Sequence, residues 1–250
     1  MKYLPSILLL LLTGSLLSAQ VAADSLTSSP GVADVIDRYL ARIGGEAAWH
    51  ELSALQLTGD ADVRGMHFPF TDTWAAGDRR RLQLDIQGNL MVQANDGTTG
   101  WLYFPMQGIT RPREITPEDG IDLRVSPFPD AFLDTSDPGA RLTGVPGREV
   151  EGRSTYGVQV THARKIDRTY YFDRETNLPV LYTYVVQSGP LEGFPVDTYL
   201  RDYEKVDGLL LPMLVEQRLR GRTTLRLTVR KVNRNPELAP DYFSMQSVMK

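Results

Sequence analysis

The chain has 250 residues, a formal net charge of −4 at pH 7 and no cysteine. Without cysteine, a disulfide scaffold, a thiol nucleophile, a cysteine zinc site and a lipid-modified N-terminal cysteine are all excluded. Charges of both signs are interspersed, and Arg79-Arg80-Arg81 is the one basic run, so nucleic acid is not an expected partner. A chain of this size can fold as one β-rich domain around its own core.

The first 23 residues have the pattern of a secretory signal peptide. Lys2 precedes the nearly all-apolar stretch 4–17, and Val21-Ala22-Ala23 supplies small residues for a signal peptidase. The apolar stretch is short for a membrane span, which needs about 20 residues, although an uncleaved N-terminal anchor is the alternative. Cleavage after Ala23 leaves 250 − 23 = 227 residues, and we expect residues 24–250 to form a single domain in the periplasm.

The mature chain opens with a predicted helix over residues 32–43. Its apolar side chains recur at i, i+3 and i+4, and Gly44-Gly45 follows as a typical helix end. A second short helical segment over 46–52 carries Trp49. A lone amphipathic helix in a β-rich chain must lay its apolar stripe on a sheet. The stripe consists of Val32, Val35, Ile36, Tyr39, Leu40 and Ile43.

Strands follow from residue 55. The first, 55–63, contains Gly59, which indicates a bulge or a bend. Three further strands are predicted at 71–75, 80–87 and 90–103; Gly88-Asn89 separates the second from the third, and Asp96-Gly97 folds the third back on itself. Apolar residues alternate strictly between 81 and 87, which predicts one apolar and one solvated face.

Residues 105–140 have no clean period and contain six prolines. We interpret them as an irregular crossover with a short helical turn at 117–123, and a connection of this length is our candidate for a lid. Strands resume at 156–161, 169–172, 180–187, 196–204, 209–219 and 223–232. The total of about ten strands is typical of an all-β sandwich or barrel.

The search for catalytic chemistry finds no motif. There is no Gly-x-Ser-x-Gly elbow, and His50, His67 and His162 have no metal-protease spacing. Residues 173–177 lack the glycine and glutamate of a calcium loop and are read as a turn. Arg79-Arg80-Arg81 is interpreted first as a charge cluster protecting a sheet edge, and alternatively as a grip on a ligand head group or a lid. We expect no enzyme activity, no metal and no cofactor.

Several stretches together resemble the outer-membrane lipoprotein-sorting, LolA-like superfamily of periplasmic carriers, in its sorting-protein-like branch. They are VIDRYLARIGGEAA (35–48), LTG (57–59), GNLMVQANDGTTGW (88–101), VEG (150–152), YYFD (170–173) with LP (178–179), and DYEKVDG (202–208) with LP (211–212). The resemblance implies a mainly β (α+β) fold, namely a curved, unclosed antiparallel barrel of about ten to eleven strands. It also implies N-terminal and crossover helices over the concave face.

The same resemblance implies that acyl chains bind between sheet and helices without catalysis. The expected partners are a lipid or an acylated lipoprotein and, in addition, inner- or outer-membrane proteins; a monomer is expected. In the classical carriers of this superfamily, an arginine holds the lid closed. That role cannot be assigned to Arg79, Arg80 or Arg81. The predicted ligand-binding residues are Tyr39, Leu40, Trp74, Leu82, Leu84, Met91, Trp101, Tyr103, Tyr182, Tyr184, Met213 and Val215.

Three functions therefore stay open from the sequence. The first is a periplasmic carrier or chaperone for a lipid or lipoprotein acyl chain. The second is an envelope-assembly scaffold that holds a protein segment on the same curved sheet. The third is an exported hydrolase whose site assembles from distant residues, with His67 or His162 as its base.

Overall fold

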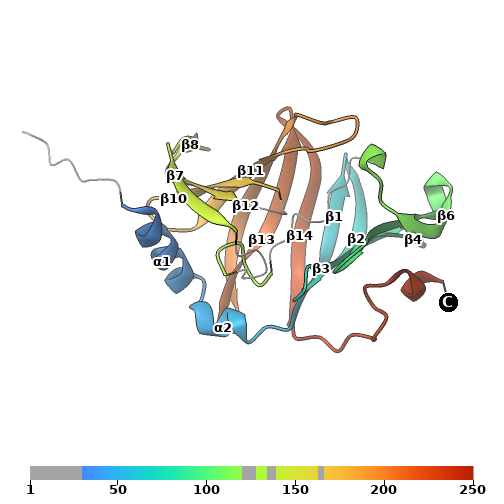
Figure 1. The fold of residues 1–250 in the computed structure, drawn as a ribbon. Helices are drawn as coiled ribbons and strands as arrows, with labels where there is room; N and C mark the ends of the chain where they lie inside the picture. Colours follow the sequence, from blue (N-terminus) through green and yellow to red (C-terminus); the bar gives the residue numbers. More distant parts are fainter. Residues whose placement is uncertain (1–29, 120–127, 134–138, 163–165, 250) are drawn as a thin grey trace, which may run out of the picture.

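The computed structural model describes residues 30–119, 128–133, 139–162 and 166–249, so the predicted signal peptide lies outside the described residues. Within these ranges the chain forms one antiparallel sheet of fourteen strands that is strongly curved and not closed (Figure 1). The strand order is β6-β5-β4-β3-β2-β1-β14-β13-β12-β11-β10-β9-β7, and β8 pairs with β9 beside this path. The predicted mainly β, unclosed architecture is confirmed.

The first and last strands of the chain meet in the middle of the sheet, where β1 pairs with β14. The strands are β1 (Ala54–Val63), β2 (Met66–Ala75), β3 (Arg79–Ile86), β4 (Asn89–Asp96), β5 (Gly100–Phe104), β6 (Ile109–Glu114), β7 (Arg141–Val145), β8 (Glu149–Val150), β9 (Arg153–Thr161), β10 (Arg168–Asp173), β11 (Pro179–Val185), β12 (Pro195–Val206), β13 (Leu209–Leu219) and β14 (Arg222–Arg234).

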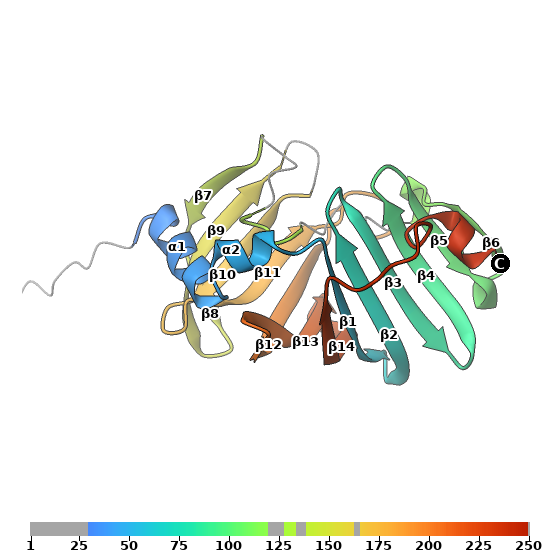
Figure 2. The ribbon, with the colours of Figure 1, turned by 90° about the horizontal axis from the view of Figure 1, so that it is seen from below.

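Two helices precede the sheet, α1 (Val32–Arg42) and α2 (Glu46–His50), close to the predicted segments. The apolar stripe of α1 is buried against the concave face, in one cluster with Val158 and Phe172 of β9 and β10. Figure 2 shows both helices over the β8–β11 part of the sheet. No helix among the described residues is both long and apolar enough to cross a membrane.

Local turn chemistry explains the β1–β4 region. The ladder between β1 and β14 shifts register at Thr58 and Gly59, which confirms the predicted bulge. A Cβ at Gly59 would collide with the carbonyl oxygen of Thr228, so the two backbones approach closely only because this residue is glycine. The hairpin between β3 and β4 also forms, although its two left-handed residues are Gln87 and Gly88, one position earlier than expected.

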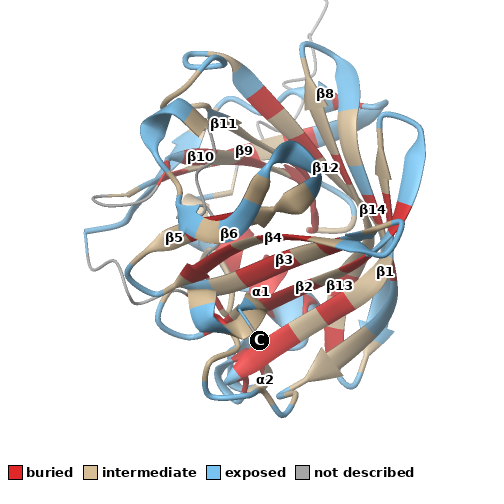
Figure 3. Ribbon diagram, turned by 90° about the vertical axis from the view of Figure 1, so that its right-hand side faces the viewer, coloured by how far each residue is buried: buried red, intermediate tan, exposed pale blue. Residues whose placement is uncertain are grey.

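The sheet has more strands than the ten to eleven expected. Strands β6, β7 and β8 account for the difference, and β6 lies inside the stretch that was interpreted as irregular. Four of the six residues of β6 are exposed and carry a polar side chain, so its sequence has no alternation of apolar side chains. Buried residues, in contrast, form bands along the central strands (Figure 3).

Of the crossover, the described residues 128–133 lie on the concave side as an irregular segment. Phe128 and Leu133 are buried there and join the main apolar cluster. The predicted helical turn at 117–123 is seen as a 3₁₀ turn, η2 (Pro117–Asp119), and its remainder lies outside the described residues.

After β14 the chain runs along the outer face of β1–β5 (Figure 2). Residues 235–249, here called the C-terminal strap, include the 3₁₀ helix η3 (Met245–Val248). Phe243 packs on Ala54 and Ala75, and its carbonyl oxygen accepts a 2.8 Å hydrogen bond from the indole of Trp101. The strap therefore covers apolar surface that the β1–β5 sheet carries on its outer side.

The arginine run 79–81 does not protect a sheet edge, so the first interpretation of it is wrong. Strand β3 lies between β2 and β4, and its successive side chains point to opposite faces. Arg80 faces the concave side. Arg81 is buried under the strap, where it donates a 2.8 Å hydrogen bond to the carbonyl oxygen of Tyr242.

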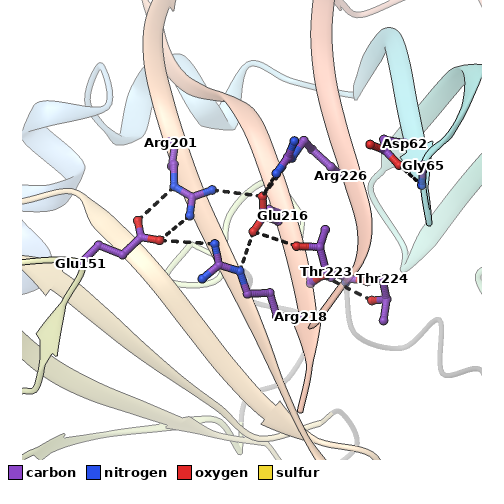
Figure 4. Close-up of polar contacts among 10 residues, drawn as sticks. Asp62, Gly65, Glu151, Arg201, Glu216, Arg218, Thr223, Thr224 and Arg226 are labelled. Carbon is purple, nitrogen blue, oxygen red and sulfur yellow. Dashed lines mark hydrogen bonds and ion pairs between the residues drawn. The ribbon is translucent and has the colours of Figure 1, made fainter. Parts of the chain in front are cut away.

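Besides the strap, the outer face carries a network of arginines and carboxylates across β12, β13 and β14 (Figure 4). Glu216 is its centre, with 1% of its side chain exposed. It accepts hydrogen bonds from Arg226 at 2.9 and 2.7 Å and from Arg218, and Arg201 lies 3.5 Å away. Arg201 also pairs with Glu151 in the turn between β8 and β9 at 2.6 Å. The network thus ties four parts of the sheet together.

The network predicts acid sensitivity. Burial alone raises the pKa of Glu216, but the hydrogen bonds from Arg226 and Arg218 outweigh burial and lower this pKa to about 2. A depressed carboxyl pKa stabilises the fold above the unfolded-state pKa of about 4.3, and this stability is lost as the pH falls toward 2. Glu216 alone contributes a slope of up to about 1.4 kcal/mol per pH unit in that window.

We therefore expect Glu216→Gln to flatten the fall in the free energy of unfolding between pH 4.3 and pH 2, measured by urea denaturation at several pH values. The matched control is Glu204→Gln, which removes an exposed carboxylate from β12. Equal slopes in wild type and Glu216→Gln would contradict the role assigned to the network.

Candidate functional site

A cavity of about 220 Å³ lies between the concave face of the sheet, α1 and residues 128–133. Its base is aliphatic and comes from β1, β13 and β14, the strands at the centre of the sheet. Side chains an even number of residues apart on a strand share a face, and each of these strands supplies at least two aliphatic lining residues of this kind. They include Leu55, Leu57, Leu211, Val215, Leu227 and Val229.

Aromatic side chains form the walls. Trp74 comes from β2, Tyr170 from β10 and Tyr203 from β12, and Tyr182 and Tyr184 sit two apart on β11. Burial raises the pKa of Tyr170 to about 12, although the nearby Arg168 lowers it, so its hydroxyl stays protonated near pH 7. Large apolar surface with hydroxyl groups at its edges suits a ligand that is mostly hydrocarbon.

Ring contacts fasten residues 128–133 to the rest of the site. The ring of Phe132 lies 5.5 Å from Tyr39 of α1 and 5.0 Å from Tyr170 of β10, both edge to face. Such pairs contribute about 0.5–1.5 kcal/mol each beyond the area that they bury. The segment therefore closes one side of the cavity by packing on a helix and a strand at once.

One hydrogen bond adds to this closure. The hydroxyl of Tyr39 donates to the carboxylate of Asp130 at 2.6 Å, and the second oxygen of Asp130 accepts from the backbone N–H of Phe132 at 2.9 Å. Burial first, and then the charge of Asp130, raise the pKa of Tyr39 well above its ordinary value. Tyr39 therefore remains a neutral donor, and it links α1 to the crossover.

An ion pair is buried in the wall beside Trp74. Arg80 donates to both oxygens of Asp72, at 3.0 and 2.8 Å, and only 2% of the Asp72 side chain is exposed. Its guanidinium carbon also lies 5.7 Å from the ring of Trp74. Burial lowers the pKa of Arg80, but Asp72 more than offsets this and raises it, so Arg80 stays charged.

A second guanidinium enters the cavity from the other half of the sheet. Arg168 on β10 is 7% exposed. It donates a hydrogen bond to the hydroxyl of Tyr170 at 3.3 Å and lies over the ring of Tyr182 at 4.9 Å. The cavity is therefore apolar in its base and carries two cations in its walls.

The structure gathers some of the predicted ligand-binding residues into this cavity. Tyr39, Trp74, Tyr182, Tyr184 and Val215 line it. A second group does not line it but packs in the same apolar cluster, on the concave side. That group is Leu40, Leu82, Leu84, Met91 and Met213.

Trp101 and Tyr103 lie on the other face of the sheet. They belong to a separate cluster with Met245 and Val248, under the C-terminal strap. The next residue of β5, Phe104, packs against the main cluster instead. Both residues were predicted to bind the ligand, but the face that carries them is turned away from the cavity.

Sequence reasoning missed Asp72 and Arg168, along with Tyr170 and Tyr203, and considered Arg80 only in its alternative interpretation of the arginine run. The alternation of side chains between the two faces of a strand could have identified these residues. Asp72 lies between Phe70 and Trp74 on the inward face of β2, and Arg168 has the same parity as Tyr170. A charged residue at an inward position of an apolar strand is a site candidate, because a buried charge needs a partner.

Neither the lining nor the described residues as a whole favour metal chemistry. No group of three or more histidine, cysteine, aspartate or glutamate side chains with metal-binding geometry is found among the described residues. The three histidines, including His67 and His162, are absent from the cavity lining that the structure describes.

Comparison with known proteins finds similarity in structure only. No family model matches the sequence, and no curated protein matches it. A domain assigned to outer membrane lipoprotein sorting in Vibrio parahaemolyticus matches with a TM-score of 0.57 at 13% identity, over 88% of this chain and 98% of that chain. LolA superfamily protein NE2245 from Nitrosomonas europaea matches with a TM-score of 0.55 at 9% identity, over 86% and 98%.

A DUF1329 family protein from Desulfovibrio piger matches with a TM-score of 0.56 at 12% identity, over 88% of this chain and 100% of that one. These similarities extend over nearly the whole described chain. The chain therefore has the LolA-like fold, an open and strongly curved antiparallel sheet with few helices.

The buried pair in the wall yields a stability prediction. Asp72→Asn removes the charge of the buried carboxylate that binds Arg80 through both of its oxygens, and we expect the free energy of unfolding to fall by about 3–5 kcal/mol. The double variant Asp72→Leu/Arg80→Met removes both charges and should recover most of this loss. Urea denaturation measures both changes.

The control is Asp60→Asn, because the pair of Asp60 with Arg230 has a similar 3.0 Å distance but is exposed. Its loss should cost about 0–1 kcal/mol. A double variant as unstable as Asp72→Asn would show that burial of an unpaired charge is not the cause.

Proposed function

We propose that this protein is an exported, non-enzymatic carrier that shelters the hydrocarbon part of a lipid or of an acylated lipoprotein in its concave cavity. The observation that carries the proposal is the cavity itself, with an aliphatic base and aromatic walls beneath α1 and residues 128–133. The fold supports it, since one similar structure bears a lipoprotein-sorting name. Removal of residues 1–23 on export is part of the proposal.

The size of the cavity sets the energy that it can supply. If a methylene occupies roughly the ~30 Å³ of a water molecule, then about seven methylenes fit into 220 Å³. At ~0.8 kcal/mol per buried methylene, they contribute about 5–6 kcal/mol before the costs of association. Ligand sites usually measure about 300–1,000 Å³, so the cavity as it stands holds part of one acyl chain.

A longer chain needs more room, and residues 128–133 can provide it. They lie on the concave face without belonging to any strand, and they are held by ring contacts and by the hydrogen bond from Tyr39 to Asp130. Displacement of this segment would open concave apolar surface without breaking a ladder of the sheet. In this proposal the segment and the ligand compete for the same face, which also gives the carrier a route to release.

The proposal is tested with the three tryptophans of the chain, in variants that each keep one and replace the other two with phenylalanine. The probe is palmitate brominated along its chain, which quenches indole fluorescence at short range. Trp74 lines the cavity, whereas Trp101 is on the opposite face of the sheet. We expect strong quenching of Trp74 and little of Trp101.

The Trp101 variant is thus an internal control, and thermal unfolding verifies that each variant folds. Equal quenching of Trp74 and Trp101, or saturable binding with no quenching of Trp74, would place the acyl chain elsewhere. Absence of binding would overturn the carrier function.

The competition between segment and ligand makes a further prediction. Tyr39→Phe keeps the ring contacts but removes the donor to Asp130, a hydrogen bond to a charged acceptor that contributes about 1.5–3 kcal/mol. The segment should then be displaced more easily, and palmitate should bind roughly 3- to 10-fold more tightly in equilibrium dialysis. The control is Tyr171→Phe, on the outer side of β10. Unchanged or weaker binding by Tyr39→Phe would contradict the displacement.

A further inference from the structure

The polar groups of the cavity are unevenly supplied with partners. Asp72 uses both of its oxygens on Arg80, and Asp130 accepts from Tyr39 and from the backbone of Phe132. The indole N–H of Trp74 is buried and has no acceptor among the described residues. The indole N–H of Trp74 is therefore an unused donor, whereas the carboxylates of Asp72 and Asp130 already accept hydrogen bonds from protein groups.

Arg168 shows the imbalance most clearly. A guanidinium presents five N–H donors and keeps its charge in proteins. The contacts of Arg168 are one long hydrogen bond to the Tyr170 hydroxyl and the face of the Tyr182 ring. Among the described residues no carboxylate lies within ion-pair distance of it, although the residue is only 7% exposed.

Several other buried or half-buried arginines of the sheet meet a carboxylate, whereas buried Arg81 donates to the carbonyl oxygen of Tyr242 and to the hydroxyl of Ser247. Arg80 meets Asp72, and Arg201, Arg218 and Arg226 meet Glu216. A buried charge without a counter-ion costs several kcal/mol, so such a residue is stabilised when something else supplies the anion. The planar fork of a guanidinium matches the geometry of a carboxylate or a phosphate.

The position of the acids limits where an anion can lie. Asp130 is at the end of the cavity formed by α1 and the crossover, where a second negative charge would be repelled. Tyr182 and Tyr184 accompany Arg168 in the wall formed by β10 and β11. A ligand with an anionic head therefore fits with its head in that wall and its hydrocarbon over the aliphatic base.

We propose that Arg168 binds the anionic head group, a carboxylate or a phosphate, of a single-chain lipid whose hydrocarbon occupies the cavity. The inference rests on the proposed carrier function and names the class of ligand that the cavity selects. It favours a fatty acid or a lysophospholipid with a phosphate monoester over a lipid that has a neutral head.

The test compares three probes with the same 16-carbon chain: palmitate and palmitoyl lysophosphatidate below their micelle concentrations, and 1-hexadecanol below its solubility limit. Equilibrium dialysis with the full mature chain gives the dissociation constants. We expect at least one anionic probe to bind ten-fold or more tightly than 1-hexadecanol. Which of the two binds more tightly distinguishes a carboxylate from a phosphate head.

Variants of Arg168 distinguish binding of the head group from binding of the hydrocarbon chain. Arg168→Gln should reduce the preference for the anionic probe to less than three-fold while the affinity for 1-hexadecanol stays within two-fold of wild type. Arg168→Lys, which keeps the charge, should retain part of the preference. The control is Arg230→Gln, which removes an exposed cation from β14 and should leave all three constants unchanged.

The two proposals fail in different ways. If wild type binds 1-hexadecanol and both anionic probes equally, the head-group inference is wrong and the carrier function stands. If wild type binds no probe, both are wrong. The wild-type comparison decides the inference even if Arg168→Gln does not fold, and thermal unfolding reports on that variant.

Discussion

The structure depends on the problem of covering both faces of a wide, curved sheet. An apolar sheet face must pack against something or stay exposed to water at about 25 cal/mol for each Å². On the outer side, the C-terminal strap covers β1–β5, and a network centred on Glu216 makes β12–β14 polar. On the concave side, α1 and residues 128–133 cover part of the face and leave a cavity of about 220 Å³. The cavity is thus what remains of a concave surface that the chain only partly fills.

The charges inside this cavity have two different physical roles. Asp72 and Arg80 satisfy each other, so they lend the wall rigidity and make a polar spot beside Trp74 without demanding a ligand. Arg168 is satisfied much less well, since a tyrosine hydroxyl and a ring face replace the carboxylate that Arg80 and the arginines around Glu216 possess. The first arrangement contributes to a unique fold, and the second adds a preference that aliphatic side chains alone cannot create. Hydrocarbon burial sets how tightly a chain binds, while a buried cation sets which head group accompanies it.

The similarity to solved LolA-like structures fixes the fold and leaves the ligand to be argued from this chain's own residues. At 9–13% identity, the lining side chains of these proteins cannot be transferred position by position. One fold can host many functions, because the function lies in the site. For this protein the relevant particulars are the inward charges on β2, β3 and β10 and the crossover segment held by Tyr39.

The sequence by itself determined the local structure: the helix at 32–43, most strands of the sheet, the bulge at Gly59 and the hairpin after β3. Periodicity and turn chemistry act over a few residues, so they can be read without coordinates. It also showed the alternation of apolar side chains between residues 81 and 87. Only the tertiary structure decided which face is concave and which is covered by the strap. Trp101, for example, binds Phe243 of the strap, which lies 142 residues away along the chain. The same holds for Arg80 and Arg168. Alternation assigns each of them to a face of its strand. That Arg80 has a carboxylate partner and Arg168 has none among the described residues is decided only when the whole sheet has formed.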